Sequence, residues 1–167
     1  MEFREIQPNE IVGNVFDRIG RQWMLITAGK LEKCNTMTAS WGGLGVLWGK
    51  NVATCYIRPQ RYTRTFVEQE EFFTLSFFGE DYRQALNLCG TKSGRELDKI
   101  AQAGLTPTTC DCGSVFFKEA ELVLCCRKIY TDIIKPENFL EPSIKANYPN
   151  EDYHHLYIGE IVKVFVK

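Results

Sequence analysis

The segment Asn35-Thr36-Met37-Thr38-Ala39-Ser40-Trp41-Gly42-Gly43 runs from small and hydroxylated residues into an aromatic residue and two glycines. Glycines inside a strand mark bulges or a close approach of backbone. We therefore expect residues 36–48 to form one strand region that bends at its glycines. Residues 51–57 are expected to pair with this region across a turn at Gly49-Lys50, and Pro59 should end that strand because proline cannot donate to a ladder.

The next segment, Tyr56-Ile57-Arg58-Pro59-Gln60-Arg61-Tyr62-Thr63, sets two arginines among aromatic residues. Hydroxyls, backbone N–H groups and arginines suit an anionic group such as a phosphate, and aromatic side chains can cover an apolar ring. Together the two segments predict a site for a ligand with a flat aromatic body and an anionic tail. The residues alone leave a second interpretation open, an ordinary β-hairpin with solvated arginines.

Outside this region, short helices alternate with strands, without a regular βαβ pattern. Helices are predicted at residues 64–69, with Thr63 as N-cap, at 81–88, and at 95–102 behind a capping box at Ser93 and Glu96. Further strands are predicted at 22–29, 72–78, 119–134 and 157–166. This pattern favours one domain over residues 1–167, mainly β with short helices, built as a closed antiparallel barrel.

A proline-punctuated stretch separates the last two predicted strands. It contains Pro136, Pro142 and Pro149 and is longer than most connections. We expect it to be partly mobile or to cover a site.

The net charge of −1, from 20 basic and 21 acidic residues in 167, provides no general attraction to nucleic acid or to an anionic membrane. No apolar run approaches the ~20 residues that span a bilayer, and the first residues do not resemble a secretory signal. Seven cysteines, an odd number, indicate reduced thiols and a cytoplasmic location.

The cysteines do not show the spacing of a common metal site. Cys110 and Cys112 form a C-x-C pair, and Cys125 and Cys126 are adjacent, so a strand would point them to opposite faces. Neither pair has the C-x-x-C spacing of zinc ribbons or iron–sulfur sites. We therefore expect no metal, only buried cysteines and one loop pair. His154 and His155, the only two histidines, are expected to be structural or partly exposed.

Four segments in order, residues 35–41, 56–63, 71–78 and 89–99, resemble the flavin reductase family, specifically its flavoredoxin-like branch. The resemblance covers roughly residues 10–130. It implies an FMN-binding split β-barrel, usually a homodimer, that handles electrons through the flavin.

The resemblance also implies where the flavin would bind. The run 36–41 would follow the ring and the ribityl chain, with the hydroxyls of Thr38 and Ser40, and Arg58 and Thr63 are the first choices at the phosphate, before Arg61 and Tyr62. Only one of Phe77 and Phe78 could touch the ring. The implied cofactor-binding set is Thr36, Met37, Thr38, Ala39, Ser40, Trp41, Tyr56, Arg58, Arg61, Tyr62, Thr63, Ser76, Phe77, Phe78, Thr91, Lys92, Ser93, Gly94 and Lys99.

No catalytic side chain is expected, because hydride transfer mainly requires that two rings be positioned. The absence of G-x-G-x-x-G and Walker loops favours FMN over a dinucleotide. Two redox functions remain open, beside a flavin-binding or structural module without redox turnover. One is an FMN-dependent oxidoreductase that passes electrons from NAD(P)H to free flavin or another acceptor. The other is a flavoredoxin-like carrier that keeps its FMN and receives electrons from a redox protein.

Overall fold

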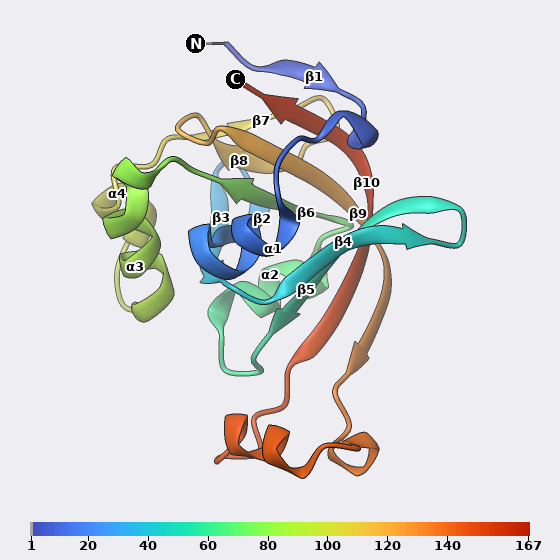
Figure 1. Cartoon of the computed structure of the whole chain (residues 1–167). Helices are drawn as coiled ribbons and strands as arrows, with labels where there is room; N and C mark the ends of the chain where they lie inside the picture. Colours follow the sequence, from blue (N-terminus) through green and yellow to red (C-terminus); the bar gives the residue numbers. More distant parts are fainter. Residues whose placement is uncertain (1) are drawn as a thin grey trace.

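The computed structural model describes residues 2–167 as a curved antiparallel sheet with short helices around it (Figure 1). The strands are β1 (Arg4–Ile6), β2 (Met24–Lys30), β3 (Lys33–Ala39), β4 (Gly42–Leu47), β5 (Lys50–Ile57), β6 (Phe72–Phe77), β7 (Pro107–Thr109), β8 (Val115–Phe117), β9 (Leu122–Ile133) and β10 (His155–Val166). The α-helices are α1 (Val15–Asp17), α2 (Tyr62–Gln69), α3 (Arg83–Thr91) and α4 (Lys99–Gln102). A π-helical turn covers Arg18–Gln22, and 3₁₀ turns cover Pro8–Glu10, Glu80–Tyr82, Pro136–Asn138 and Pro142–Asn147.

The main sheet has the order β3-β2-β6-β9-β10-β5-β4, with β1 paired to β10. Its two edge strands, β3 and β4, are consecutive in the chain and are separated only by Ser40 and Trp41. No strand pairing joins these edges within residues 2–167, so the sheet is split along this seam. The prediction of a mainly β fold with short helices is confirmed, whereas closure of the barrel by hydrogen bonds stays a prediction.

Both faces of the central strands are covered, which explains their nearly continuous apolar sequence. On one face Met24, Ile26 and Phe73 pack into a core that also takes Phe66 and Val67 from α2. The other face carries a second core, which packs α3 and the β7–β8 hairpin against the sheet through Leu25, Leu86, Phe116, Phe117 and Val123. The two layers place α2 and α3 on opposite faces of β3 and its neighbours.

Two predicted helix starts are wrong. Helix α2 begins at Tyr62, so Thr63 lies inside the helix and Arg61 occupies the N-cap position. The predicted helix over 95–102 is reduced to α4, capped by the side chain of Asp98, which accepts from the N–H of Ala101 at 3.0 Å. The hydroxyl of Ser93 instead accepts from the N–H of Arg95 at 3.2 Å, and this local turn competes with a helix start.

Helix α3 continues past its predicted end at Leu88 to Thr91 and therefore contains Gly90. A Cβ on Gly90 would lie 3.3 Å from the Cβ of Thr38, so the glycine allows α3 to pack closely on β3. Among residues 2–167, no helix combines the length and the apolar character that crossing a membrane requires.

The packing of β10 gives a stability prediction. A Cβ on Gly159 would lie 2.6 Å from the Cβ of Cys126 and 2.8 Å from the ring of Phe73, and overpacking of this kind costs about 1–3 kcal/mol. We expect Gly159→Ala to lower the free energy of unfolding by that amount in urea titrations. Gly45→Ala is the control, because its Cβ meets nothing within 4 Å; equal destabilisation by both would contradict the packing argument.

Candidate functional site

A cavity of about 190 Å³ opens between β3 and the C-terminal end of β5, beside the seam. Strand β3 pairs only with β2, so the backbone groups on its outer edge have no strand partner. Edge groups of this kind are free to bind a ligand. The cavity is lined by Met37, Thr38, Ala39, Ser40, Trp41, Tyr56, Arg58, Arg61 and His154.

A second cavity of about 200 Å³ lies beyond Arg61, which lines both. This second cavity is formed where α2 begins and where α3 ends. Its lining residues are Gln60, Arg61, Tyr62, Gly90, Thr91, Lys92, Ser93 and Lys99. The structure therefore brings the run 37–41, the arginine segment and the connector 91–93 together around one arginine.

Two cations, the half-buried Arg61 and the buried Lys99, meet at this second cavity. The guanidinium of Arg61 donates to the carbonyl oxygens of Gly90 at 2.8 Å and Cys89 at 3.1 Å. The ammonium of Lys99, which is 3% exposed, donates to the carbonyl oxygens of Cys89 at 3.2 Å and Lys92 at 3.1 Å. No carboxylate of residues 2–167 forms a salt bridge with either cation.

Burial and mutual repulsion act on these cations. Burial, together with the positive charge of Arg61, lowers the pKa of Lys99 to about 8. Burial also lowers the pKa of Arg61. Buried charges are normally paired, so the geometry has the electrostatics of an anion site: two cations, oriented by carbonyl oxygens, whose charge a bound anion would compensate.

Arg58 differs from Arg61 because its charge is already compensated. It forms a salt bridge with Asp152 at 2.7 Å, donates to the carbonyl oxygen of Asn147 at 2.8 Å, and lies 5.1 Å from the ring centre of Tyr148. These contacts hold the segment between β9 and β10 beside the cavity. Arg58, the first choice for a phosphate in the sequence, is thus less suited to an anion than Arg61 and Lys99.

His154 was missed as a site residue, and the structure places it in the cavity wall. Its Nδ1 lies 2.9 Å from the hydroxyl of Tyr148, and its ring lies 5.0 Å from that of Trp41, centre to centre. Burial and the nearby charge of Arg58 lower the pKa of His154 to about 4, so the ring is neutral at pH 7. The signal in the sequence was the long proline-containing stretch before the last strand, of which His154 lines the first cavity; that this stretch covers a ligand stays a prediction.

The predicted hydroxyls have different roles. Thr36 is fully buried, and its hydroxyl bonds to that of Thr27 at 2.8 Å. Thr63 is also buried and accepts from the amide of Asn35 at 2.8 Å, so it reaches neither cavity. Thr38 lines the first cavity while donating to the carbonyl oxygen of Leu86, and Ser40 also lines this cavity.

The next predicted strand does not reach the cavities. Ser76 and Phe77 are buried, and Phe77 belongs to the core that contains α2. Phe78 belongs to the opposite core. Neither phenylalanine lines the two cavities, because both faces of β6 are covered, and contact of either ring with a ligand stays a prediction.

The connector after α3 is only partly as predicted. Thr91, Lys92 and Ser93 line the second cavity. Gly94 lies outside it, where a Cβ would come within 2.1 Å of the side-chain oxygen of Asn35, so the connector can approach β3 only with glycine at this position. Tyr62 lines the second cavity, and the guanidinium of Arg95 stacks over its ring, 4.5 Å from the ring centre.

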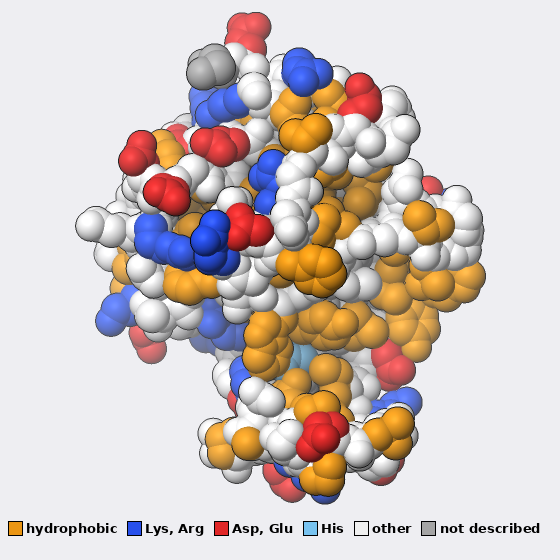
Figure 2. Space-filling model, viewed as in Figure 1, with side chains coloured by type: hydrophobic (Ala, Val, Ile, Leu, Met, Phe, Trp, Pro, Cys, Tyr) orange, Lys and Arg blue, Asp and Glu red, His pale blue; other side chains and the backbone are white. Residues whose placement is uncertain are grey.

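An exposed apolar surface adjoins the first cavity. Phe16 is 88% exposed and Trp41 is 44% exposed. Both line a hollow of about 710 Å³ that also takes residues 42–44 and Tyr56. Figure 2 shows hydrophobic side chains gathered across the middle of this face, over α1 and β4 and above the segment between β9 and β10.

This fold is shared by solved structures of split-barrel, flavin reductase-like proteins. In the structure of an FMN-binding domain of a flavin reductase-like enzyme from Shewanella baltica, the match covers 99% of this chain and 77% of that one, with 17% identity and a TM-score of 0.71. Flavoredoxin of Desulfovibrio vulgaris matches over 87% and 69%, with 22% identity and a TM-score of 0.67. The NADH:FAD oxidoreductase of Streptomyces globisporus matches over 87% and 75%, with 13% identity and a TM-score of 0.64.

The sequence itself specifies the family. Residues 16–167 match the model of the flavin reductase like domain, and the chain belongs to this family. No curated protein gives a significant match. The resemblance noted in four segments of the sequence is thereby confirmed.

Proposed function

We propose that the protein binds FMN across the two cavities and is an oxidoreductase of the flavin reductase type. The observation that carries this proposal is a pair of cations without a salt-bridged carboxylate: the half-buried Arg61, which lines both cavities, and the buried Lys99, which lines the second. A phosphomonoester carries about two negative charges near neutral pH, which would match two cations. Membership of the family and the FMN-binding protein from Shewanella baltica support the same ligand.

The residues of the first cavity suit the flavin ring of FMN. Met37, Tyr56 and Trp41 offer apolar and aromatic surface for a ring. The free edge of β3 offers backbone donors and acceptors for its polar rim, and the neutral ring of His154 adds no charge. When bound, the flavin would supply the redox chemistry, accepting a hydride and passing electrons on.

The chain's own part is to bind, orient and exclude water. The hydroxyl of Thr38 and the guanidinium of Arg61 both bond to carbonyl oxygens of α3, so α3 and β3 hold the cavity walls at a defined separation. Such positioning supplies most of what hydride transfer between two rings needs. FMN rather than FAD follows from the absence of a dinucleotide loop, and chromatography of flavin released by denaturation would reveal FAD if that inference were wrong.

Removal of the uncompensated cations tests the phosphate site. We expect Lys99→Met, and separately Arg61→Ala, to weaken FMN binding by roughly ten- to a hundredfold, since a charge-assisted hydrogen bond contributes about 1.5–3 kcal/mol. Riboflavin, which has no phosphate, should bind with nearly unchanged affinity. Fluorescence quenching of each flavin gives both dissociation constants.

The control variant is Arg58→Ala, whose effect should be about equal for FMN and riboflavin because Arg58 holds the 135–154 segment through Asp152. A pH series adds a check: because the pKa of free Lys99 is about 8, FMN affinity should fall above pH 8 in the natural protein and not in Lys99→Met. Equal losses of FMN and riboflavin in Lys99→Met would mean that Lys99 supports the fold and not the phosphate.

The electron donor separates the two candidate functions. We expect NADH or NADPH to reduce the flavin-loaded protein and to sustain turnover with free flavin as acceptor. The alternative is a flavoredoxin-like carrier served by a redox protein, favoured by the exposed apolar surface beside the cavity. Stopped-flow reduction decides: slow reduction by both nucleotides, in a protein that holds FMN tightly, would establish the carrier. We also propose a cytoplasmic location, on the basis of seven free cysteines.

We further propose a homodimer formed through the apolar surface around Phe16 and Trp41. Aromatic residues are enriched at interfaces. The hollow of about 710 Å³ adjoins the first cavity, so the part of the site proposed for the flavin ring is open on that side. If a second copy supplies that wall, FMN binding and dimerisation are linked, and FMN stabilises the dimer by mass action.

Phe16→Ser should therefore raise the dimer dissociation constant about tenfold or more in sedimentation experiments, since burying a phenylalanine contributes about 1.5–3 kcal/mol. Leu31→Ser, an exposed apolar residue at the β2–β3 turn, is the control. A natural protein that stays monomeric at every concentration while binding FMN tightly would contradict the dimer and the shared site.

A further inference from the structure

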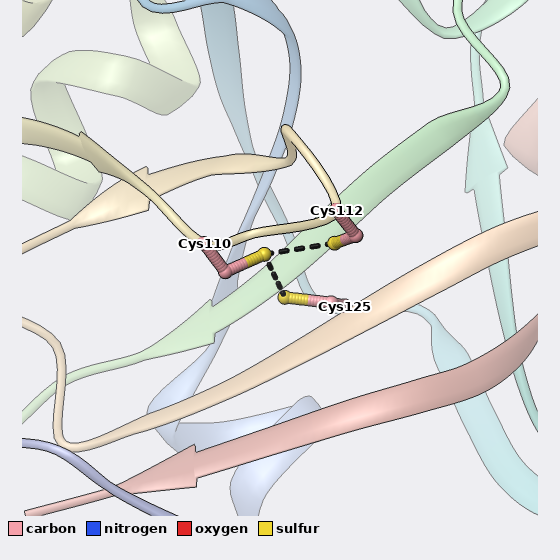
Figure 3. A group of neighbouring side chains, drawn as sticks. All are labelled: Cys110, Cys112 and Cys125. Atoms are coloured by element: carbon pink, nitrogen blue, oxygen red, sulfur yellow. Dashed lines mark hydrogen bonds between the residues drawn. The ribbon is translucent and has the colours of Figure 1, made fainter.

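Three cysteine thiols converge on the face of the sheet that carries the β7–β8 hairpin (Figure 3). Cys110 and Cys112 come from the turn between β7 and β8, and Cys125 comes from β9. The sulfur of Cys110 lies 2.8 Å from that of Cys112 and 3.8 Å from that of Cys125. All three sulfurs lie within 4.8 Å of one another.

The turn is shaped so that both of its cysteines face the sheet. The N–H of Gly113 donates to the carbonyl oxygen of Cys110 at 2.9 Å, and Gly113 has a φ of +77°, which favours glycine. The N–H of Cys110 donates to the carbonyl oxygen of Ser114 at 3.3 Å. Cys125 completes the group because Cys126 points to the other core, as expected for neighbours in a strand.

The spacing of the sulfurs suits one cation. A circle through three points separated by 2.8, 3.8 and at most 4.8 Å has a radius of about 2.4 Å or less, close to the Zn–S bond length of about 2.3 Å. A cation just outside the plane of the sulfurs would reach all three. The 3.8 Å edge already equals the separation of two thiolates on a tetrahedral zinc, and the 2.8 Å edge would open by about 1 Å.

We propose that Cys110, Cys112 and Cys125 form a three-thiolate site for a thiophilic cation, with Zn²⁺ as the representative ion. Thiolate ligands select zinc and copper(I) over magnesium and calcium. Cys110 and Cys112 are partly exposed, which provides an entry path and leaves a fourth position for water, whereas Cys125 is buried and fixes the depth of the site.

Groups around the site hold the turn in place. Asp111, between the two turn cysteines, forms a salt bridge with Lys163 of β10 at 2.8 Å, and Lys163 also pairs with Glu5 at 3.2 Å. The hydroxyl of Ser114 lies 3.1 Å from the sulfur of Cys112. Such surrounding contacts orient metal ligands, and a bound cation would fasten the β7–β8 hairpin to β9.

This inference revises the expectation of no metal, which was based on spacing along the chain. It does not depend on the flavin site, because none of the three cysteines lines either of its cavities. The role it assigns is structural, so the test measures binding and stability and not turnover.

The test uses the whole protein, reduced, freed of metal and kept without oxygen. Zn²⁺ is titrated in competition with a chromophoric chelator, and Co²⁺ is used separately because thiolate coordination gives it characteristic absorption. We expect one ion per chain, a charge-transfer band from thiolate to cobalt, and a rise in melting temperature with free Zn²⁺, since an ion that binds only the folded state stabilises it.

Three variants complete the design. Cys125→Ser and Cys112→Ser should each weaken Zn²⁺ binding at least tenfold. Even the loss of a group that only hydrogen-bonds to a metal ligand typically lowers metal affinity about 10- to 100-fold. Cys34→Ser, a partly buried thiol on β3 outside the group, is the control and should bind as the natural protein does. Cys112 is partly exposed, so its variant remains informative if Cys125→Ser does not fold.

Two outcomes would overturn the proposal. One is a reduced natural protein that binds Zn²⁺ no more tightly than Cys112→Ser does. This outcome includes a purified chain with a Cys110–Cys112 disulfide that still fails to bind Zn²⁺ after the disulfide has been reduced. The other is full affinity in a folded Cys125→Ser, which would mean that the loop pair alone binds the ion.

Discussion

Strands β2 and β6 are buried on both faces, and the rest of the structure depends on this constraint. A sheet with two apolar faces requires two covering layers. One face packs against α2 and the interior of the curved sheet, and the other against α3 and the β7–β8 hairpin. The N-terminal end of α2 and the C-terminal end of α3 therefore meet at the edge strand β3, and the candidate flavin site lies where they meet.

This meeting point has an electrostatic consequence. The last carbonyl oxygens of a helix have no partners within the helix, and in α3 the carbonyls of Cys89 and Gly90 are satisfied by Arg61. Lys99 from α4 shares the carbonyl of Cys89. The carbonyl dipoles stabilise the two positive charges without neutralising them, so the site keeps its attraction for an anion. A carboxylate in their place would have removed it, as Asp152 does for Arg58.

The sequence predicted the strands well because their apolar patterns are strong, and the family resemblance pointed to several of the residues that line the two cavities. It failed where contacts between distant segments decide. The helix expected over residues 95–102 does not begin at residue 95, because the side chain of Ser93 forms a local turn and Gly94 packs closely against Asn35. The buried state of Thr63 depends on Asn35, 28 residues earlier, and the compensation of Arg58 depends on Asp152, 94 residues later. No local pattern carries either contact.

The cysteines illustrate the same limit from the opposite side. Zinc-site motifs are recognised by spacing because most of their ligands come in pairs from one turn, and here the turn supplies only Cys110 and Cys112. The third thiol comes from β9, and the alternation of a strand predicted that one of Cys125 and Cys126 would face each core. The sequence pattern could not predict that the β7–β8 turn lies over the same face of the sheet as Cys125. That placement follows from the packing of Phe116 and Phe117 against Leu25 and Val123. The same second core that positions α3 at the candidate flavin site thus also brings the three thiols together, and one packing layer accounts for both groups.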